Sequence, residues 1–368
     1  MDFTKSEAHS AVEALAQQVF HGQVDDEYLK NWSDDQAEFD AALWQTIGDA
    51  GLIGVAGDEQ FGGAGFGFLE LSSALEAQGS VLAGVPLWQS AVVANALEQF
   101  ADAALSKALL PDVYAGRQHL ALGLGDLCRE QMGSVVSSDG ETLSGTIDDV
   151  AWAQHATAIL IGLHVKGEPA LYLLRPELDA IGFQQQDTSY RHAHFQLSVD
   201  NIDIDPARII CTGAEVDTVI QAALTALAAL QLGVVEEVLK RTAQYTIERQ
   251  QFGKAIASFQ SVSHRAADGY VDCAALRASV LLAAWKLSAG EDARTEARTA
   301  KWWACEAGHR IGHTAQHLHG GIGSDIAYPI HRFFRWTKQL EYGLGGAQEQ
   351  LASLGRLLAE HDELGIIV

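Results

Sequence analysis

Apolar side chains recur at three- and four-residue steps after residue 216, and this period predicts one long helix. The residues on its apolar face are Leu227, Leu230, Val234, Val238 and Tyr245. We expect Gly253 to break this helix and Ser258 to cap the next one. The chain therefore makes a sharp corner near residue 253.

The hydrophobic pattern changes twice along the chain, which divides it into three predicted domains. Residues 1–115 follow helical periodicity, and Phe39, Leu43 and Ile47 share a face there beside Trp44. Residues 116–210 alternate between turns and β-branched runs, with strands expected at 133–136, 158–161, 170–174 and 194–199. Residues 211–368 are helical again and predict a four-helix-type domain. The expected fold class is α+β: an N-terminal helical domain, a middle β domain and a C-terminal helical bundle.

Composition excludes several classes of function. The chain has 368 residues, of which 48% are hydrophobic, and a formal net charge of −24, which disfavours nucleic-acid and anionic-membrane partners. Gly, Gln or charged residues interrupt every apolar run, so we expect no membrane span, and no signal peptide is visible. The four cysteines are far apart and predict buried thiols in a cytoplasmic protein.

The corner after the long helix carries the first candidate chemistry. Arg249 offers a planar donor fork suited to a phosphate or carboxylate, and the ring of Phe252 could pack on a flat ring system. A solvated arginine at a helix–turn–helix corner is the plain alternative. The glycine-rich stretch at 52–65 predicts a loop between helices, because the lysine and strand context of a phosphate-binding loop are missing.

The longer string around that corner resembles the acyl-CoA dehydrogenase family signature. Arg249-Gln250-Gln251-Phe252-Gly253 precedes Phe259-Gln260, and a second matching string is His319-Gly320-Gly321-Ile322-Gly323. The resemblance implies that Arg249 and Phe252 hold the FAD of a neighbouring subunit and that the glycine segment wraps its ADP half. The cofactor-binding residues carried over on this resemblance are Arg249, Phe252, Gln260, His317, Gly320, Gly321 and Gln348.

The resemblance also implies a carboxylate that removes the substrate's α proton, and this chain lacks it. In the family, that base has a raised pKa and the β hydride moves to the flavin. The two family positions for the base are occupied here by Leu344 and Ala223, neither of which can take a proton. Glu341 and Glu215 are nearby in sequence, but each residue along a helix turns a side chain by roughly 100°. We therefore expect no catalytic residue in this chain.

The groups that hold the flavin ring in the family are also changed. Leu122 to Cys128 stands where the family's flavin-contacting loop is expected, and Gly346 replaces a flavin-bonding threonine. Trp152 resembles the family's flavin-stacking tryptophan, without the threonine two residues later. The resemblance thus implies that the chain keeps the residues that contact the FAD of a neighbouring subunit. It lacks the residues that would hold a flavin ring of its own.

This split resembles the catalytically silent subunit of the heteromeric acyl-CoA dehydrogenases of bacterial steroid side-chain breakdown. The resemblance implies an α2β2 complex with fewer flavins than chains, a homologous partner that carries the carboxylate, an acyl-CoA substrate and electron-transfer flavoprotein. The alternatives are a homo-oligomeric enzyme that uses Glu341 and a cofactor-free interaction protein. We expect no metal at His317, His319 and His331, and helix packing or an interface at Trp302-Trp303.

Overall fold

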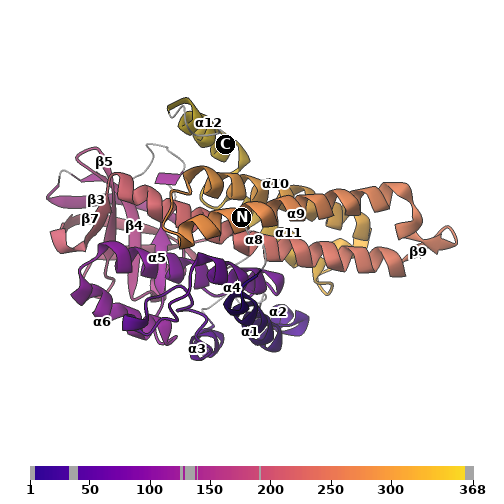
Figure 1. Cartoon of the computed structure of the whole chain (residues 1–368), viewed down its shortest axis with the longest axis horizontal. Coiled ribbons are helices and arrows are strands. Elements are labelled where there is room, and N and C mark those ends of the chain that lie inside the picture. Colours follow the sequence, from indigo (N-terminus) through magenta and orange to yellow (C-terminus); the bar gives the residue numbers. More distant parts are fainter. Residues whose placement is uncertain are drawn as a thin grey trace.

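The structure is a computed structural model that describes residues 5–32, 40–124, 127–128, 137–138, 140–189 and 192–360. Helices come first, a β-sheet follows and a second set of helices completes the chain (Figure 1). This order confirms the predicted α+β fold. The boundaries proposed at residues 115 and 210 stay a prediction, and the last strand runs on to Thr212.

The N-terminal helices pack their apolar faces around α4 and α5. On α3, Leu43, Trp44 and Ile47 are buried as predicted, whereas Phe39 lies outside the described residues. The helices are α1 (Glu7–Gln23), α2 (Asp26–Trp32), α3 (Ala41–Asp49), α4 (Phe68–Ser80), α5 (Leu87–Phe100) and α6 (Ala103–Tyr114). The glycine-rich stretch before α4 forms turns and a short 3-10 helix at Glu59–Phe61, so it is a loop between helices.

Eight described strands form one mixed sheet in the order β6-β7-β3-β2-β4-β5-β8, with β1 paired parallel to β4. The strands expected at 158–161, 170–174 and 194–199 are confirmed within β4, β5 and β7, and the one at 133–136 lies outside the described residues. The strands are β1 (Leu120–Gly123), β2 (Ser137–Ser138), β3 (Thr142–Ala151), β4 (Ala158–Val165), β5 (Glu168–Leu174), β6 (Ile181–Gln186), β7 (His194–Asp203) and β8 (Ile209–Thr212).

Strand β3 was missed in the sequence because its alternation is interrupted. Its pairing with β7 shifts register between Leu143 and Gly145 and again between Ile147 and Val150. Asp149 lies in the second irregularity with a left-handed backbone (φ 61°). Such bulges place extra residues in one strand and re-aim a side chain, so a strict two-residue period cannot find them.

The C-terminal helices are built around α8 (Ala214–Glu248), which confirms the long predicted helix. Of its apolar face, Leu227, Leu230, Val234 and Val238 are buried, and Tyr245 is half-buried. Helices α4 and α8 touch through their backbones, since a Cβ on Gly233 would lie 1.9 Å from the carbonyl oxygen of Glu76. The helices after α8 are α9 (Gln260–Ser288), α10 (Arg294–His319), α11 (Ile330–Tyr342) and α12 (Ala347–Glu360).

Two expectations about the corner were wrong in detail. Helix α8 already ends at Glu248, and a two-stranded hairpin of β9 (Gln250–Gln251) and β10 (Lys254–Ala255) follows. Gly253, with φ 78°, lies in the hairpin turn, a conformation that glycine adopts at little cost. The hydroxyl of Ser258 donates to the carbonyl oxygen of Ala255 and does not cap α9, whose N-cap is Phe259.

Helix α8 corrects the expectation that no segment suits a membrane by length and composition. Among the residues that the structure describes, it is the one helix long and apolar enough to span a bilayer. The most apolar part of α8 is 94% buried inside the protein. Packing against α4, α9 and α10 therefore accounts for its apolar surface.

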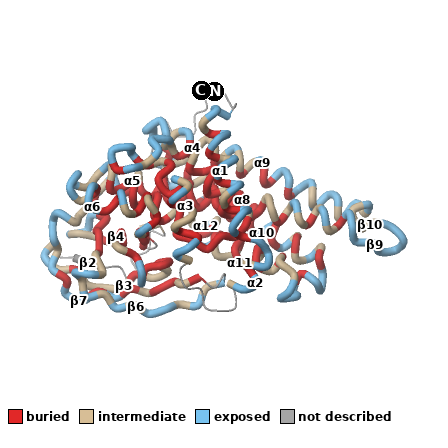
Figure 2. Tube along the Cα trace, turned by 90° about the horizontal axis from the view of Figure 1, so that it is seen from below, coloured by how far each residue is buried: buried red, intermediate tan, exposed pale blue. Residues whose placement is uncertain are grey.

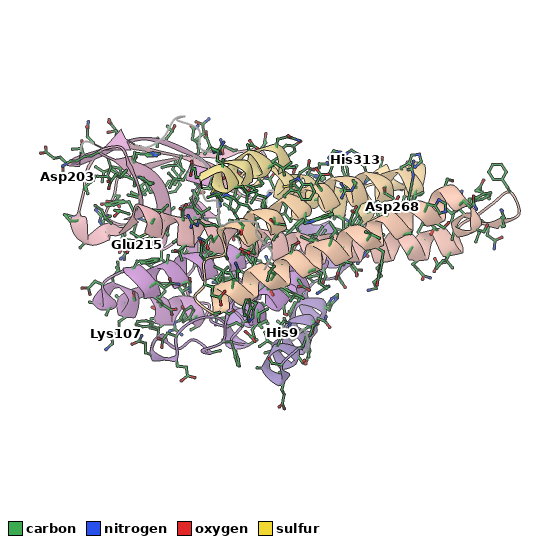
Figure 3. The ribbon with its side chains drawn as sticks, turned by 45° about the horizontal axis from the view of Figure 1, so that its top comes forward. His9, Lys107, Asp203, Glu215, Asp268 and His313 are labelled. Atoms are coloured by element: carbon green, nitrogen blue, oxygen red, sulfur yellow. The ribbon has the colours of Figure 1, made fainter. Side chains whose placement is uncertain are left out.

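The hairpin and the adjoining ends of α8 and α9 project beyond the rest of the molecule (Figure 1). In Figure 3, Glu215 marks the sheet end of α8, and Asp268 lies on α9 toward the hairpin. The inner turns of α8 are buried, whereas the hairpin and the first turns of α9 are exposed (Figure 2). Large apolar side chains are exposed there, including Ile247, Phe252, Tyr270 and Val271.

Candidate functional site

Leu344, one of the two positions where a catalytic base was sought, lines a small cavity. It has a volume of about 40 Å³, and Leu344 and Leu227 line it together with Trp88 of α5 and Leu122 of β1. Leu227 lies one helical turn after Ala223, which is fully buried. The cavity has room for only a few water molecules. Among the described residues, the side chains around Leu344 therefore leave little free space.

Two carboxylates line this cavity, and both are held by side chains of the same sheet. The Asp148 carboxylate accepts hydrogen bonds from the amides of Gln196 (2.6 Å) and Gln186 (3.1 Å). The Asp149 carboxylate pairs with Nδ1 of His194 at 2.6 Å. Sequence reasoning missed these residues, because the bulge in β3 is what turns them toward the cavity.

Glu341, the alternative base, does not line the cavity although it is close to Leu344 in sequence. Its carboxylate pairs with Nζ of Lys338 at 2.7 Å and with Nδ1 of His309 at 3.2 Å. These partners lie on α11 and α10. The Glu341 carboxylate is therefore held by side chains of α10 and α11 and does not face the cavity beside Leu344.

A buried lysine holds the segment that leads into the Leu344 turn. Lys301 is fully buried, and its ammonium donates to the carbonyl oxygens of Leu340 (3.0 Å) and Glu341 (3.1 Å) at the end of α11. It also contacts Sγ of Cys305 at 3.0 Å. A cation is favourable at a helix C-terminus. The sequence could have indicated this burial, because Lys301 lies among small residues at helical spacing: Ala297, Ala300, Ala304 and Ala307.

Trp152, the expected flavin-stacking residue, is covered by other side chains of this chain. It is 3% exposed, and the ring of His192 lies 5.2 Å from its ring. The same histidine contacts Trp336 of α11 edge-on at 5.0 Å. A Cβ on Gly84 would lie 2.9 Å from His192 Nε2, so helical and β domains meet here. A flavin ring has no face of Trp152 on which to stack.

This junction makes a pH-dependent prediction. Burial lowers the pKa of His192 from 6.5 to about 3, so the folded state keeps the imidazole neutral while the unfolded chain binds a proton below pH 6.5. Stability from His192 is present at neutral pH and is lost as pH falls from 6.5 toward 3. At pH 5 the loss is about 2 kcal/mol.

His192→Gln should therefore flatten the pH dependence of unfolding, measured as the change in the urea midpoint between pH 7 and pH 5. The difference between parent and variant isolates one imidazole, because all other titrating groups are shared. His21→Gln removes an exposed histidine of α1 and should leave the dependence unchanged. Identical pH dependence of the parent and His192→Gln would show that His192 is not buried neutral.

The candidate cofactor contacts gather at the opposite end of the C-terminal helices. The ring of Tyr245, near the end of α8, stacks on His319 at the end of α10, with centroids 4.3 Å apart. Its hydroxyl lies 3.4 Å from the carbonyl oxygen of His319. The Arg249 corner is thereby brought beside the glycine segment that begins at Gly320. Sequence reasoning predicted both elements, and the structure places them together.

Side chains at this end are exposed and available to a partner. Phe252 is 91% exposed. The Arg249 guanidinium is exposed and makes no hydrogen bond or ion pair within the described part of the chain. A Cβ on Gly321 would meet nothing within 4 Å, and Gly320 has φ 62°. Exposed glycine backbone allows close approach of a phosphate.

A second arginine at this end was missed in the sequence. Nη1 of Arg265, on the first turns of α9, donates to Nδ1 of His317 at 2.7 Å. Since Nδ1 accepts, a neutral His317 carries its proton on Nε2, which is a donor. In the sequence, Arg265 follows Gln260 by five residues, and this position could have marked it as a candidate. The end of the bundle therefore presents two guanidinium groups, an imidazole and exposed glycine backbone.

Of the predicted cofactor-binding residues, Gln348 is the one that the structure does not bring to this end. It is exposed on the first turn of α12. Helix α12 packs on the sheet-side half of α10, where Nε of Arg298 donates to Oγ of Ser353 at 2.7 Å. Arg249, Phe252, Gln260, His317, Gly320 and Gly321 lie together at the far end.

Comparison with known proteins gives the family. Residues 6–117 match the family model "Acyl-CoA dehydrogenase, N-terminal domain", and residues 218–358 match "Acyl-CoA dehydrogenase, C-terminal domain". The chain is 34% identical to the acyl-CoA dehydrogenase FadE27 of Mycobacterium tuberculosis, over 98% of this chain and 99% of that one. The chain belongs to the acyl-CoA dehydrogenase family.

Two solved acyl-CoA dehydrogenase structures are similar along nearly the whole length. One is the ChsE4-ChsE5 complex from Mycobacterium tuberculosis, with a TM-score of 0.91 and 34% identity over 98% of this chain and 100% of the matched chain. The other is a variant of the Tcur3481-Tcur3483 steroid enzyme, with a TM-score of 0.88 and 35% identity over 96% of this chain and 98% of the matched chain. Both names describe assemblies of two different chains, and one describes a steroid enzyme.

FAD is the cofactor of acyl-CoA dehydrogenases, and the two halves of this chain fit it differently. The cavity beside Leu344 is too small for a three-ring flavin, and Trp152 is covered. The far end of the bundle offers the donors that a diphosphate needs, led by Arg249 and Arg265. For metals, no group of three or more His, Cys, Asp or Glu side chains within the described ranges could hold an ion.

Proposed function

We propose that this chain is the non-catalytic subunit of a heteromeric acyl-CoA dehydrogenase and completes the FAD site of its partner. The complex introduces an α,β double bond into a CoA thioester, and the acyl group is a steroid side chain. The observation that carries the proposal is the contrast between the two ends of the C-terminal helices. The chain's own cavity beside Leu344 has a volume of only about 40 Å³, whereas Arg249 is exposed and unpaired within the described residues.

The partner in this proposal is a homologous subunit that supplies the catalytic carboxylate in an α2β2 assembly. The large apolar side chains exposed near the projecting hairpin support this pairing; they are Ile247, Phe252, Tyr270 and Val271. Apolar side chains gathered on an exposed surface mark an interface. The pairing in the ChsE4-ChsE5 structure and the steroid assignment of the Tcur enzyme support it by similarity. Electron-transfer flavoprotein is the proposed electron acceptor, and the cytoplasm is the proposed location.

In this assembly, the partner's site would hold FAD, which would supply the hydride acceptor for oxidation at the substrate's β carbon. The residues of this chain act by binding. Arg249 and Arg265 hold phosphate charge, Nε2–H of His317 adds a donor, and the backbone at Gly320 and Gly321 allows a close approach. Phe252 offers a ring to the partner. No proton is transferred by Leu344 or Ala223.

Flavin content tests this assignment. Expressed alone, the chain should be colourless or insoluble, because its interface is buried only against its partner. Co-expressed with a neighbouring gene for a second acyl-CoA dehydrogenase, it should copurify as a yellow complex with about one FAD per pair. Stoichiometric FAD in the purified single chain would overturn the proposal and favour the homo-oligomeric enzyme. A soluble, colourless single chain that never pairs would favour a cofactor-free interaction protein.

A further inference from the structure

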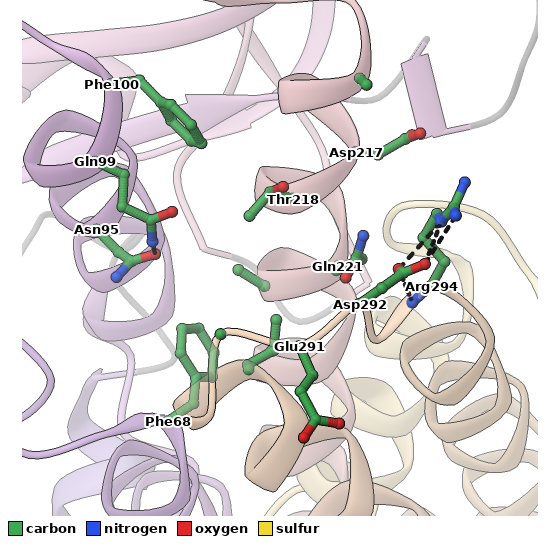
Figure 4. A pocket seen from close by; sticks show the side chains of 14 residues that line it. Phe68, Asn95, Gln99, Phe100, Asp217, Thr218, Gln221, Glu291, Asp292 and Arg294 are labelled. Atoms are coloured by element: carbon green, nitrogen blue, oxygen red, sulfur yellow. Dashed lines mark hydrogen bonds and ion pairs between the residues drawn. The ribbon is translucent and has the colours of Figure 1, made fainter.

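A second and much larger cleft opens where the N-terminal helices meet the start of α8. It has a volume of about 520 Å³, within the range of small-molecule sites. Its walls come from α4 and α5 on one side and from the first turns of α8 and the α9–α10 loop on the other (Figure 4). None of the predicted cofactor-binding residues lines it.

The cleft lies on the other side of α8 from the Leu344 cavity. Asp217, Thr218 and Gln221 line the cleft from one face of the helix. At 100° per residue, Ala223 and Leu227 lie about 125–170° around the helix from the centre of that face. The cleft is therefore not a continuation of the Leu344 cavity.

The floor of the cleft contains a donor without a partner among the described residues. Gln221 is 5% exposed, and its Oε1 accepts the backbone N–H of Ala293 at 2.9 Å. That N–H can only donate, so the amide oxygen is fixed on Ala293 and the amide nitrogen faces the cleft. Nε2 has no hydrogen-bond partner within the described residues. A ligand oxygen in the cleft could accept a hydrogen bond from it.

The charges around the cleft disfavour an anionic ligand. Asp217, Glu291 and Asp292 all contribute to its lining. Arg294 is the one cation among the described lining residues, and its fork is tied to the Asp292 carboxylate through Nε (2.9 Å) and Nη2 (2.8 Å). The CoA end of an acyl-CoA would meet net negative charge here.

The rest of the wall is partly apolar. Phe68 and Phe100 lie on the α4–α5 side with the amides of Asn95 and Gln99, across from Thr218 and Gln221 (Figure 4), and Leu287 joins them from α9. We propose that this cleft binds an uncharged small molecule that has an apolar face for Phe68, Phe100 and Leu287 and a ketone or hydroxyl oxygen that accepts a hydrogen bond from Gln221. The site follows from the cleft alone and does not require the subunit role proposed above.

Binding of testosterone, a rigid neutral ketone with a hydroxyl group, tests the site by equilibrium dialysis against the copurified complex or the soluble chain. Saturable binding is expected. Gln221→Glu keeps the oxygen that accepts from Ala293 but replaces the donor with negative charge, so affinity should fall roughly tenfold or more. Ala214→Trp narrows the mouth at an exposed position of the first turn and should have the same effect without unfolding the chain.

Matched probes and sites complete the experiment. Testosterone hemisuccinate adds one carboxylate to the same ring system and should bind more weakly. Gln244→Glu changes the same residue type at an exposed position farther along α8 and should leave binding unchanged. Three outcomes would each overturn the proposal: no saturable testosterone binding up to its solubility limit, binding unaffected by both cleft variants, or equal binding of the anion. Flavin content is measured on the same samples, so failure of the cleft is distinguishable from failure of the subunit role.

Discussion

Arg249→Ala is expected to release FAD from the assembled complex while the two subunits stay together. The Arg249 side chain is exposed at the projecting end of α8 and has no competing partner within the described chain. A charge-assisted contact to phosphate contributes roughly 1.5–3 kcal/mol, so FAD affinity should fall about 10- to 100-fold. Flavin absorbance per protein after gel filtration at limiting FAD measures the loss.

Two variants sharpen this test. Lys240→Ala removes one positive charge from the same helix, at a side chain that is 75% exposed and pairs with Glu237, and should retain flavin. Arg249→Lys keeps the charge but loses the planar fork, so the FAD affinity of this variant should lie between that of the parent and that of Arg249→Ala. Full flavin in Arg249→Ala at limiting FAD would disprove the shared-site interpretation of this corner.

Turnover should depend on a carboxylate of the partner and not on Glu341. Replacing the partner's catalytic acid by its amide is expected to lower the rate of acyl-CoA oxidation roughly 100-fold or more, the range for loss of a general base. Glu341→Gln should leave the rate nearly intact, because the Glu341 carboxylate lies against Lys338 and His309 and not in the cavity. Assays of the reconstituted complex with one acyl-CoA compare the two variants.

The control for Glu341→Gln is thermal stability, since the variant also weakens two ion pairs on α10 and α11. Partly exposed pairs of this kind stabilise modestly, and a small fall in Tm with unchanged turnover is the expected pattern. A loss of roughly 100-fold in turnover at unchanged Tm would move the base to Glu341. That outcome would favour the homo-oligomeric alternative.

The sequence by itself determined the order of helices, strands and helices, the path of α8, and the residue types at the two positions that the resemblance assigns to the base. Leu227, Leu230, Val234 and Val238 repeat at helical spacing, and burial of one continuous face follows from that period alone. Leu344 and Ala223 cannot take a proton in any fold, because that is a property of the residue type. These inferences are local or chemical, so no tertiary contact was needed for them.

The tertiary structure decided where the exposed and buried groups lie. The covering of Trp152 depends on His192, which also contacts Trp336; these three residues come from separate segments and meet only when the domains pack. Lys301 reaches carbonyl groups almost forty residues later. The donor in the second cleft is unpaired because Ala293, distant in sequence, orients the amide of Gln221. Contacts between distant residues follow from packing, and the hydrophobic periodicity of the sequence does not predict them.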